Sequence, residues 1–182
     1  MGGGGLALAL AASSRGALAQ AAPDYSSHPL TGMWLAMANP GLPENPQFPA
    51  PSLFTADGFV VLVFPPIEMG SDGPLFVGNA AGVWEPYDES TGHFTVVQAL
   101  SAPDGSLVGS VTINGFPSVN DDDMSFTDHQ DKSYVTIRDA TGAILQEIPP
   151  GPGGRPVNAI RMAVDSPGFP AGVATPAATP ES

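Results

Sequence analysis

The chain has 182 residues, and its 18 acidic against 5 basic side chains give a formal net charge of −13. A surface this acidic repels nucleic-acid phosphates and anionic membranes, which argues against both as partners. The absence of cysteine excludes disulfides, thiolate catalysis and thiolate metal sites. The length suits one domain, and 22 glycines and 21 prolines favour many short strands joined by turns.

The amino-terminal stretch has features of an export signal. Residues 6–12 form a short apolar run, and small residues at 17–21 alternate as a signal-cleavage site requires. The run is too short to span a bilayer, which takes about 20 residues of helix. Residues 1–5 carry no positive charge, so an uncharged disordered leader is the alternative. We predict a signal peptide at 1–21 and a secreted or cell-envelope protein without membrane insertion.

A polar spacer at 22–28 precedes a series of predicted strands. Apolar and polar residues alternate along them, as side chains do on a half-buried strand, and Asp-Gly pairs mark tight turns between them. Two segments rich in proline or glycine, 38–52 and 65–80, are predicted to be loops. The predicted strands are 32–37, 53–56, 59–64, 82–85, 93–100, 107–116, 124–138 and 143–164, the last two being interrupted.

No stretch shows helical periodicity, so the sequence predicts an all-β antiparallel domain over residues 29–165. The tail at 166–182 has almost nothing to bury and is predicted to be disordered. A sheet of about eight strands tends to close on itself or split in two, because free edges invite pairing with other chains. The hairpin order of the strands favours an up-and-down barrel, with a β-sandwich as the alternative.

Two positions at the ends of this series resemble a known pattern. Gly32-Met33-Trp34 resembles the Gly-x-Trp pattern of lipocalins and the wider calycin superfamily, and Arg161 resembles the basic residue that these families place against the tryptophan. The resemblance implies a barrel in which Gly32, Trp34 and Arg161 close one end. It also implies that a small molecule binds inside, with segment 38–52 as a lid over the open mouth.

The strand faces indicate which residues could meet such a ligand. Alternation places residues 94–100 and 107–115 so that one face of each can point inward, with Gly109 and Gly115 leaving room beside aromatic rings. The alternative is that Gln98 bonds a backbone group and that the glycines relieve a bend. The predicted ligand-binding residues are Leu42, Phe48, Phe94, Val96, Gln98, Leu100, Val111 and Ile113.

Other chemistry finds little support in the sequence. The acids at 121–123, with Asp128 and Asp131, lack the spacing of a calcium-binding loop, and the three histidines lie far apart. We therefore predict no metal and no cofactor. Glu85 and His93 flank one turn and are weak candidates for an acid–base pair in an isomerase or cyclase, chemistry that some calycin-like barrels perform.

The sequence therefore predicts a secreted lipocalin-like β-barrel that binds a small hydrophobic or amphiphilic molecule in its interior. The expected partner is this small molecule, without nucleic acid. A barrel isomerase or cyclase is the first alternative. A filled barrel that serves as a structural or adhesive module of the cell envelope is the second.

Overall fold

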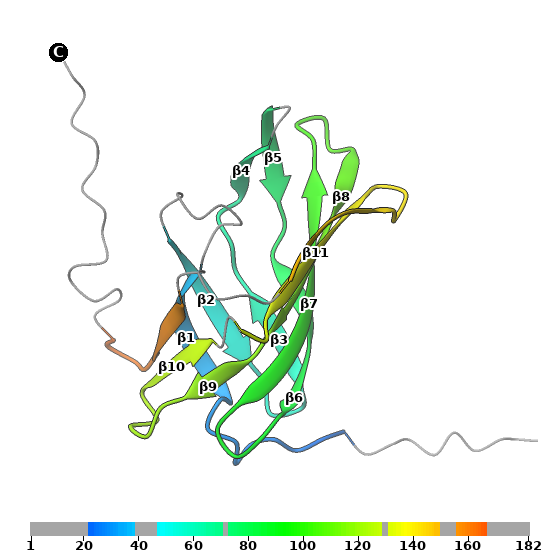
Figure 1. Cartoon of the computed structure of the whole chain (residues 1–182). Coiled ribbons are helices and arrows are strands. Elements are labelled where there is room, and N and C mark those ends of the chain that lie inside the picture. Colours follow the sequence, from blue (N-terminus) through cyan, green and yellow to red (C-terminus); the bar gives the residue numbers. More distant parts are fainter. Residues whose placement is uncertain (1–21, 39–46, 71–72, 129–130, 150–155, 167–182) are drawn as a thin grey trace, which may run out of the picture.

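The computed structural model describes residues 22–38, 47–70, 73–128, 131–149 and 156–166 (Figure 1). The predicted signal peptide, Leu42 of the predicted lid and the predicted tail from 167 onward lie outside the described residues. Within those ranges no helix is long and apolar enough to cross a membrane.

Every element within the described residues is a β-strand, and every strand pair is antiparallel. The sheet runs in the order β12-β11-β8-β7-β6-β3-β2-β1-β13-β10-β9, and β5 pairs with both β4 and β7. The predicted all-β antiparallel, barrel-like fold is therefore confirmed. The strands are β1 (Gly32–Ala38), β2 (Phe48–Phe54), β3 (Phe59–Leu62), β4 (Ile67–Gly70), β5 (Gly73–Val77), β6 (Ala80–Pro86), β7 (Gly92–Ser101), β8 (Leu107–Gly115), β9 (Pro117–Val119), β10 (Ser125–Asp128), β11 (Tyr134–Asp139), β12 (Ile144–Ile148) and β13 (Val157–Arg161).

The described residues form thirteen strands, where the sequence predicted about eight. The difference arises because several long strands are broken and change partner at the break. Only Phe116 separates β8 from β9. β8 pairs with β11, whereas β9 pairs with β10. β5 and β6 both pair with β7, on either side of a short gap at Gly78 and Asn79.

Two predicted loops are partly strand. In the first, residues 48–52 belong to β2 and pair with β1. Pro51 is tolerated because its carbonyl accepts a hydrogen bond from the Val63 amide, 2.9 Å away, so its missing N–H points away from β1. In the second, β4 and β5 form a hairpin at the end of the molecule where β7 leads into β8 (Figure 1).

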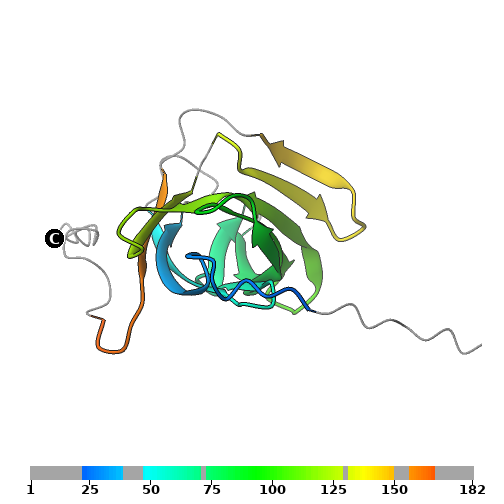
Figure 2. The ribbon, with the colours of Figure 1, turned by 90° about the horizontal axis from the view of Figure 1, so that it is seen from below.

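The first and last strands of the chain pair with each other, so the sheet curls round. β1 and β13 run antiparallel, and Trp34 stands opposite Arg161. β13 also pairs with β10, and β10 pairs with β9, the continuation of β8. Figure 2 shows the strands wrapped around a centre, with the β11–β12 hairpin standing apart. β12 pairs only with β11 among the described strands, so the result is a half-barrel, open on that side.

The core fills the end of the half-barrel that carries Trp34 and Arg161, here called the closed end; the opposite end is the mouth. Trp34, Phe54 and Val60 are fully buried there. The segment before β1 covers this end: Leu30 is completely buried, and its carbonyl accepts a hydrogen bond from Trp34 Nε1 at 2.8 Å. The fold thus has one tightly packed end and leaves room toward the mouth.

Candidate functional site

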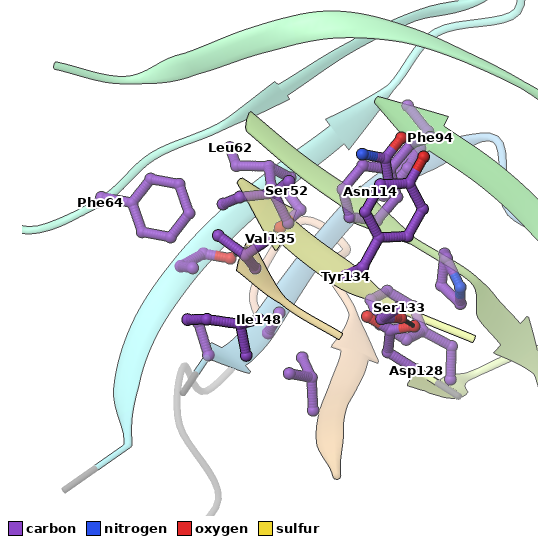
Figure 3. A pocket seen from close by; sticks show the side chains of 18 of the residues that line it. Ser52, Leu62, Phe64, Phe94, Asn114, Asp128, Ser133, Tyr134, Val135 and Ile148 are labelled. Atoms are coloured by element: carbon purple, nitrogen blue, oxygen red, sulfur yellow. Dashed lines mark hydrogen bonds between the residues drawn. The ribbon is translucent and has the colours of Figure 1, made fainter. Parts of the chain in front are cut away.

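A cavity of about 400 Å³ lies inside the curl, between the packed core and the β11–β12 hairpin (Figure 3). This volume falls within the range of about 300 to 1,000 Å³ that is typical of small-molecule sites. Its wall is mostly apolar and is contributed by strands from all around the half-barrel. The lining residues are Ala36, Ala38, Ala50, Ser52, Phe54, Leu62, Phe64, Phe94, Ile113, Asn114, Pro117, Phe126, Asp128, Ser133, Tyr134, Val135, Ile148, Pro149 and Val157.

Small side chains on β1 and β2 leave this space open. Ala36 and Ala50 are opposite each other in the strand register, and both are buried. Along β2 the alternation continues, so that Ser52 and Phe54 face inward while Pro49 and Leu53 are exposed. Ser52 donates its hydroxyl to the Ala50 carbonyl at 2.9 Å, which satisfies its buried polar hydrogen. This wall therefore presents methyl groups and one internally bonded hydroxyl.

Phe94 closes the cavity on the side of β7 and β8. A Cβ atom at Gly115 would lie 2.3 Å from the tip of the Phe94 ring, so only glycine allows the ring to lie across the β8 backbone. Gly115 stands opposite Phe94 in the strand register. The space that this glycine opens is thus occupied by the aromatic ring, as part of the cavity wall.

Apart from Ser52 on β2, polar side chains of the cavity gather at one end. Asp128 is about nine-tenths buried, and its Oδ1 accepts hydrogen bonds from the Phe116 amide at 2.8 Å and the Ser133 hydroxyl at 2.9 Å. Asn114 accepts a hydrogen bond from the Thr95 hydroxyl at 2.6 Å. Figure 3 shows Asp128 and Ser133 on the opposite side of the cavity from Phe64. The cavity is therefore amphiphilic, with an apolar body and one acidic end.

Leu42 lies outside the described residues, and the other seven predicted ligand-binding residues fall into three groups. Phe94 and Ile113 line the cavity. Phe48 is half-buried and packs edge-on against Phe64, a lining residue, with ring centroids 5.7 Å apart. The others lie along β7 and β8 but not in the wall: Val96, Gln98, Leu100 and Val111.

Gln98 is buried and bonded within the protein. Its Nε2 donates to the Gly78 carbonyl at 3.0 Å, across the short gap between β5 and β6. This is the backbone bond that the sequence left open as the alternative to a contact with a ligand. The side chain thus ties β7 to the neighbouring chain.

The residues predicted to close the barrel are brought together. The Arg161 guanidinium lies 4.2 Å from the Trp34 ring centroid. It donates Nε to the Asp123 carbonyl at 2.6 Å and Nη1 to the Thr31 carbonyl at 3.1 Å, and Nη2 bonds the Pro29 carbonyl. At Gly32 a Cβ would lie 3.0 Å from Arg161 Nη1, and φ is +135°, a conformation that favours glycine.

Glu85 and His93 are cross-strand neighbours on the outer side of β6 and β7. Both line a shallow hollow with Tyr25 and Asp57, near the closed end. The His93 ring stacks on Phe116 with centroids 4.4 Å apart, and its Nε2 is buried with no hydrogen-bond partner among the described residues. This hollow is separate from the cavity, because the two share no lining residue.

The acids at 121–123 lie in the turn between β9 and β10. Asp122 accepts hydrogen bonds from the Met124 and Ser125 amides, at 2.8 and 3.1 Å, which lower the pKa of its carboxyl below the usual value. Asp122 therefore stabilises the turn. Within the described part of the chain, no group of three or more His, Asp or Glu side chains is arranged to hold a metal ion.

Sequence reasoning missed the acidic end of the cavity. It grouped Asp128 with the acids of the preceding turn, although Phe126 and Asp128 have the spacing of two that places side chains on one strand face. That alternation was the available signal, since Phe126 is buried in the core and also lines the cavity. No protein-family model, curated protein or solved structure matches the chain.

Proposed function

We propose that this protein is an exported, calycin-like β-barrel that binds one small hydrophobic or amphiphilic molecule in its interior. The observation that carries the proposal is the cavity of about 400 Å³, whose wall is mostly apolar and carries a few polar groups. Such a composition is typical of small-molecule sites, where apolar contact supplies affinity and a few polar groups fix orientation.

The cavity also bears on the alternative of a filled barrel that serves as a structural or adhesive module. A barrel with a purely structural role gains stability from filling its interior, because unfilled volume forfeits dispersion contacts. Here Ala36 and Ala50 keep the space open in the middle of the wall, while the closed end is packed with large side chains. This contrast within one molecule favours binding over a filled interior.

The proposal is tested by filling the cavity. We expect the full-length protein to enhance the fluorescence of N-phenylnaphthylamine, and native mass spectrometry to show one bound molecule per chain. Ala50→Phe places a ring in the cavity and is expected to weaken binding about tenfold or more. Ala81→Phe is the matched control, because Ala81 is exposed on β6, and it should bind as the unmodified protein does.

Two results would contradict the proposal. The first is that the unmodified protein does not enhance the probe's fluorescence and retains no hydrophobic molecule from its expression host. The second is that Ala50→Phe and Ala81→Phe bind the probe equally well, which would place the probe outside the cavity. Thermal melting of both variants checks that each is folded, and Ala36→Leu offers a smaller substitution if Ala50→Phe is unstable.

Acid–base catalysis at the outer hollow is the second candidate. It is favoured by the register of Glu85 and His93 and by the buried Nε2 of His93, which has no hydrogen-bond partner in the part of the chain that the structure describes. A substrate that binds there would contact Tyr25 and Asp57 as well. If a substrate of the protein is identified, His93→Ala should abolish its turnover. Unchanged turnover in this variant would remove the candidate.

A further inference from the structure

We infer that the outer face of strands β2, β3, β6 and β7 is the surface through which two copies of this chain associate. These four strands are consecutive in the sheet. The surface lies outside the barrel and shares no residue with the cavity, so the inference goes beyond the proposed function and does not depend on it. Its apolar side chains, here called the outer patch, are Leu53, Phe59, Val61, Ala81, Val83 and Val97.

Strand register makes the outer patch continuous. Val61 stands opposite Ala81, and Ala81 stands opposite Val97, so one row crosses three strands. In the adjacent row Phe59 stands opposite Val83. Side chains that stand opposite each other on paired strands lie about 5 Å apart, which is close enough for contact. The outer patch is therefore one surface rather than a set of scattered side chains.

The large side chains of the outer patch are exposed. Phe59 is 57% exposed, Val83 is 58% exposed and Val97 is 51% exposed. The inner face of the same strands already fills the core, where Val60 is fully buried. Strands that are apolar on both faces are typical of sheets that are covered on both sides. The composition of β3 thus indicates that its outer face is covered as well.

The outer patch is uncharged in a protein that carries a net charge of −13. On the four described strands Glu85 is the single Asp, Glu, Lys or Arg residue. Two copies repel each other through their net charge, and this repulsion is smallest where no charged side chain faces the other copy. A second copy can therefore approach through the outer patch at little electrostatic cost.

Other partners fit this surface less well. A partner that is held by ion pairs needs charged groups, and the outer patch contains none. Surfaces that lie on membranes combine apolar with basic side chains, whereas no Lys or Arg lies on the four described strands. A flat, uncharged sheet face is matched best by another surface of the same kind.

The area of the outer patch is enough for a weak dimer. Its side chains leave on the order of 500 Å² exposed, near the upper end of the range for the largest apolar patch of a monomer. Two copies that cover each other's patch would bury on the order of 1,000 Å², where specific interfaces begin. Two sheets can pack face to face with interdigitated side chains, and a twofold axis lets the same residues serve both copies.

Sedimentation velocity of the full-length protein tests this association. We expect a reversible dimer with a dissociation constant of about 10 µM, because an interface of this size is at the weak end of the range. Raising the salt concentration from about 50 to about 500 mM should strengthen the dimer, since it screens the repulsion between the two negatively charged copies. An association through ion pairs would weaken over the same change.

Substitutions at Val83 locate the interface. Val83→Glu places a charge in the outer patch and should raise the dissociation constant about tenfold or more. Val164→Glu is the matched control, because it makes the same change in net charge at a residue that is 94% exposed beyond β13, and it should dimerise as the unmodified protein does. Val83→Thr combined with Val97→Thr keeps the β-branched shape and should raise the constant about threefold or more. Thermal melting checks that each variant is folded.

The inference is supported if Val83→Glu weakens the dimer and Val164→Glu does not. A protein that stays monomeric at about 200 µM and high salt would overturn it. A dimer that persists unchanged in both Val83 variants forms through another surface, and one that weakens with salt is held by charge; either result contradicts the inference. A monomer that floats with phosphatidylcholine vesicles, and loses this property in Val83→Glu, would assign the outer patch to lipid instead. None of these results alters the proposed function.

Discussion

Arg161 allows the closure of the half-barrel to be tested quantitatively. Its guanidinium covers the Trp34 ring and bonds backbone carbonyls from two separate segments, Pro29 and Thr31 before β1 and Asp123 in the β9–β10 turn. Arg161→Ala removes all of these contacts at once. The variant also leaves three carbonyls to find other donors.

The expected loss of stability follows from those contacts. A half-buried cation–π contact contributes about 1 kcal/mol, and each of the three hydrogen bonds contributes about 1 kcal/mol. Together these amount to about 4 kcal/mol, a large part of the stability of an ordinary domain. Arg161→Lys keeps the charge but lacks the planar fork, and we expect it to lose about 2 kcal/mol.

Urea unfolding followed by far-ultraviolet circular dichroism measures these losses. Arg138→Ala is the control, because within the described residues the Arg138 side chain donates one hydrogen bond, to the Gly142 carbonyl in an exposed turn, and it should cost less than about 0.5 kcal/mol. A loss below about 1 kcal/mol in Arg161→Ala would show that the guanidinium does not stabilise the closure. A double-mutant cycle with Trp34→Leu, which has no aromatic face, isolates the contact between the guanidinium and the ring.

Three further predictions concern packing and acid stability. Gly115→Ala should cost about 1 to 3 kcal/mol, because its Cβ would clash with Phe94, while Gly78→Ala, where a Cβ has ordinary contacts, should be nearly neutral in thermal melting. Leu30→Ala should cost about 2 to 5 kcal/mol in urea unfolding, since Leu30 is fully buried, and a smaller loss would show that the segment before β1 is not part of the core. The lowered pKa of Asp122 means that the unfolded chain takes up a proton first, so the free energy of unfolding should fall below about pH 4. Asp122→Asn should lessen this fall, and an unchanged pH profile would contradict it.

The ends of the strand series were predictable from the sequence. Gly32-Met33-Trp34 in the first strand and Arg161 in the last resemble the lipocalin pattern, and that resemblance implied the contact between Trp34 and Arg161 that the structure has. The central hairpin was equally clear, because Asp104-Gly105 sits between two long alternating runs. Gly105 has a φ of +84°, as such a turn requires.

The polar end of the cavity was harder to predict because it forms where strands change partner. Asn114 directly follows Ile113. In a regular strand the two side chains would lie on opposite faces, yet both line the cavity. β8 ends one residue later, and the chain moves from pairing with β11 to pairing with β10. Local periodicity does not indicate such a change, since it depends on distant strands.

The antiparallel pairing of β1 with β13 has a mechanical consequence. β1 begins, and β13 ends, at the same end of the pair, so tension applied between the two chain termini pulls these strands apart sideways. The interstrand bonds then carry the load one after another rather than together. We expect β1 and β13 to separate at low force, and the contacts that Arg161 makes with Trp34 and the backbone carbonyls to break first.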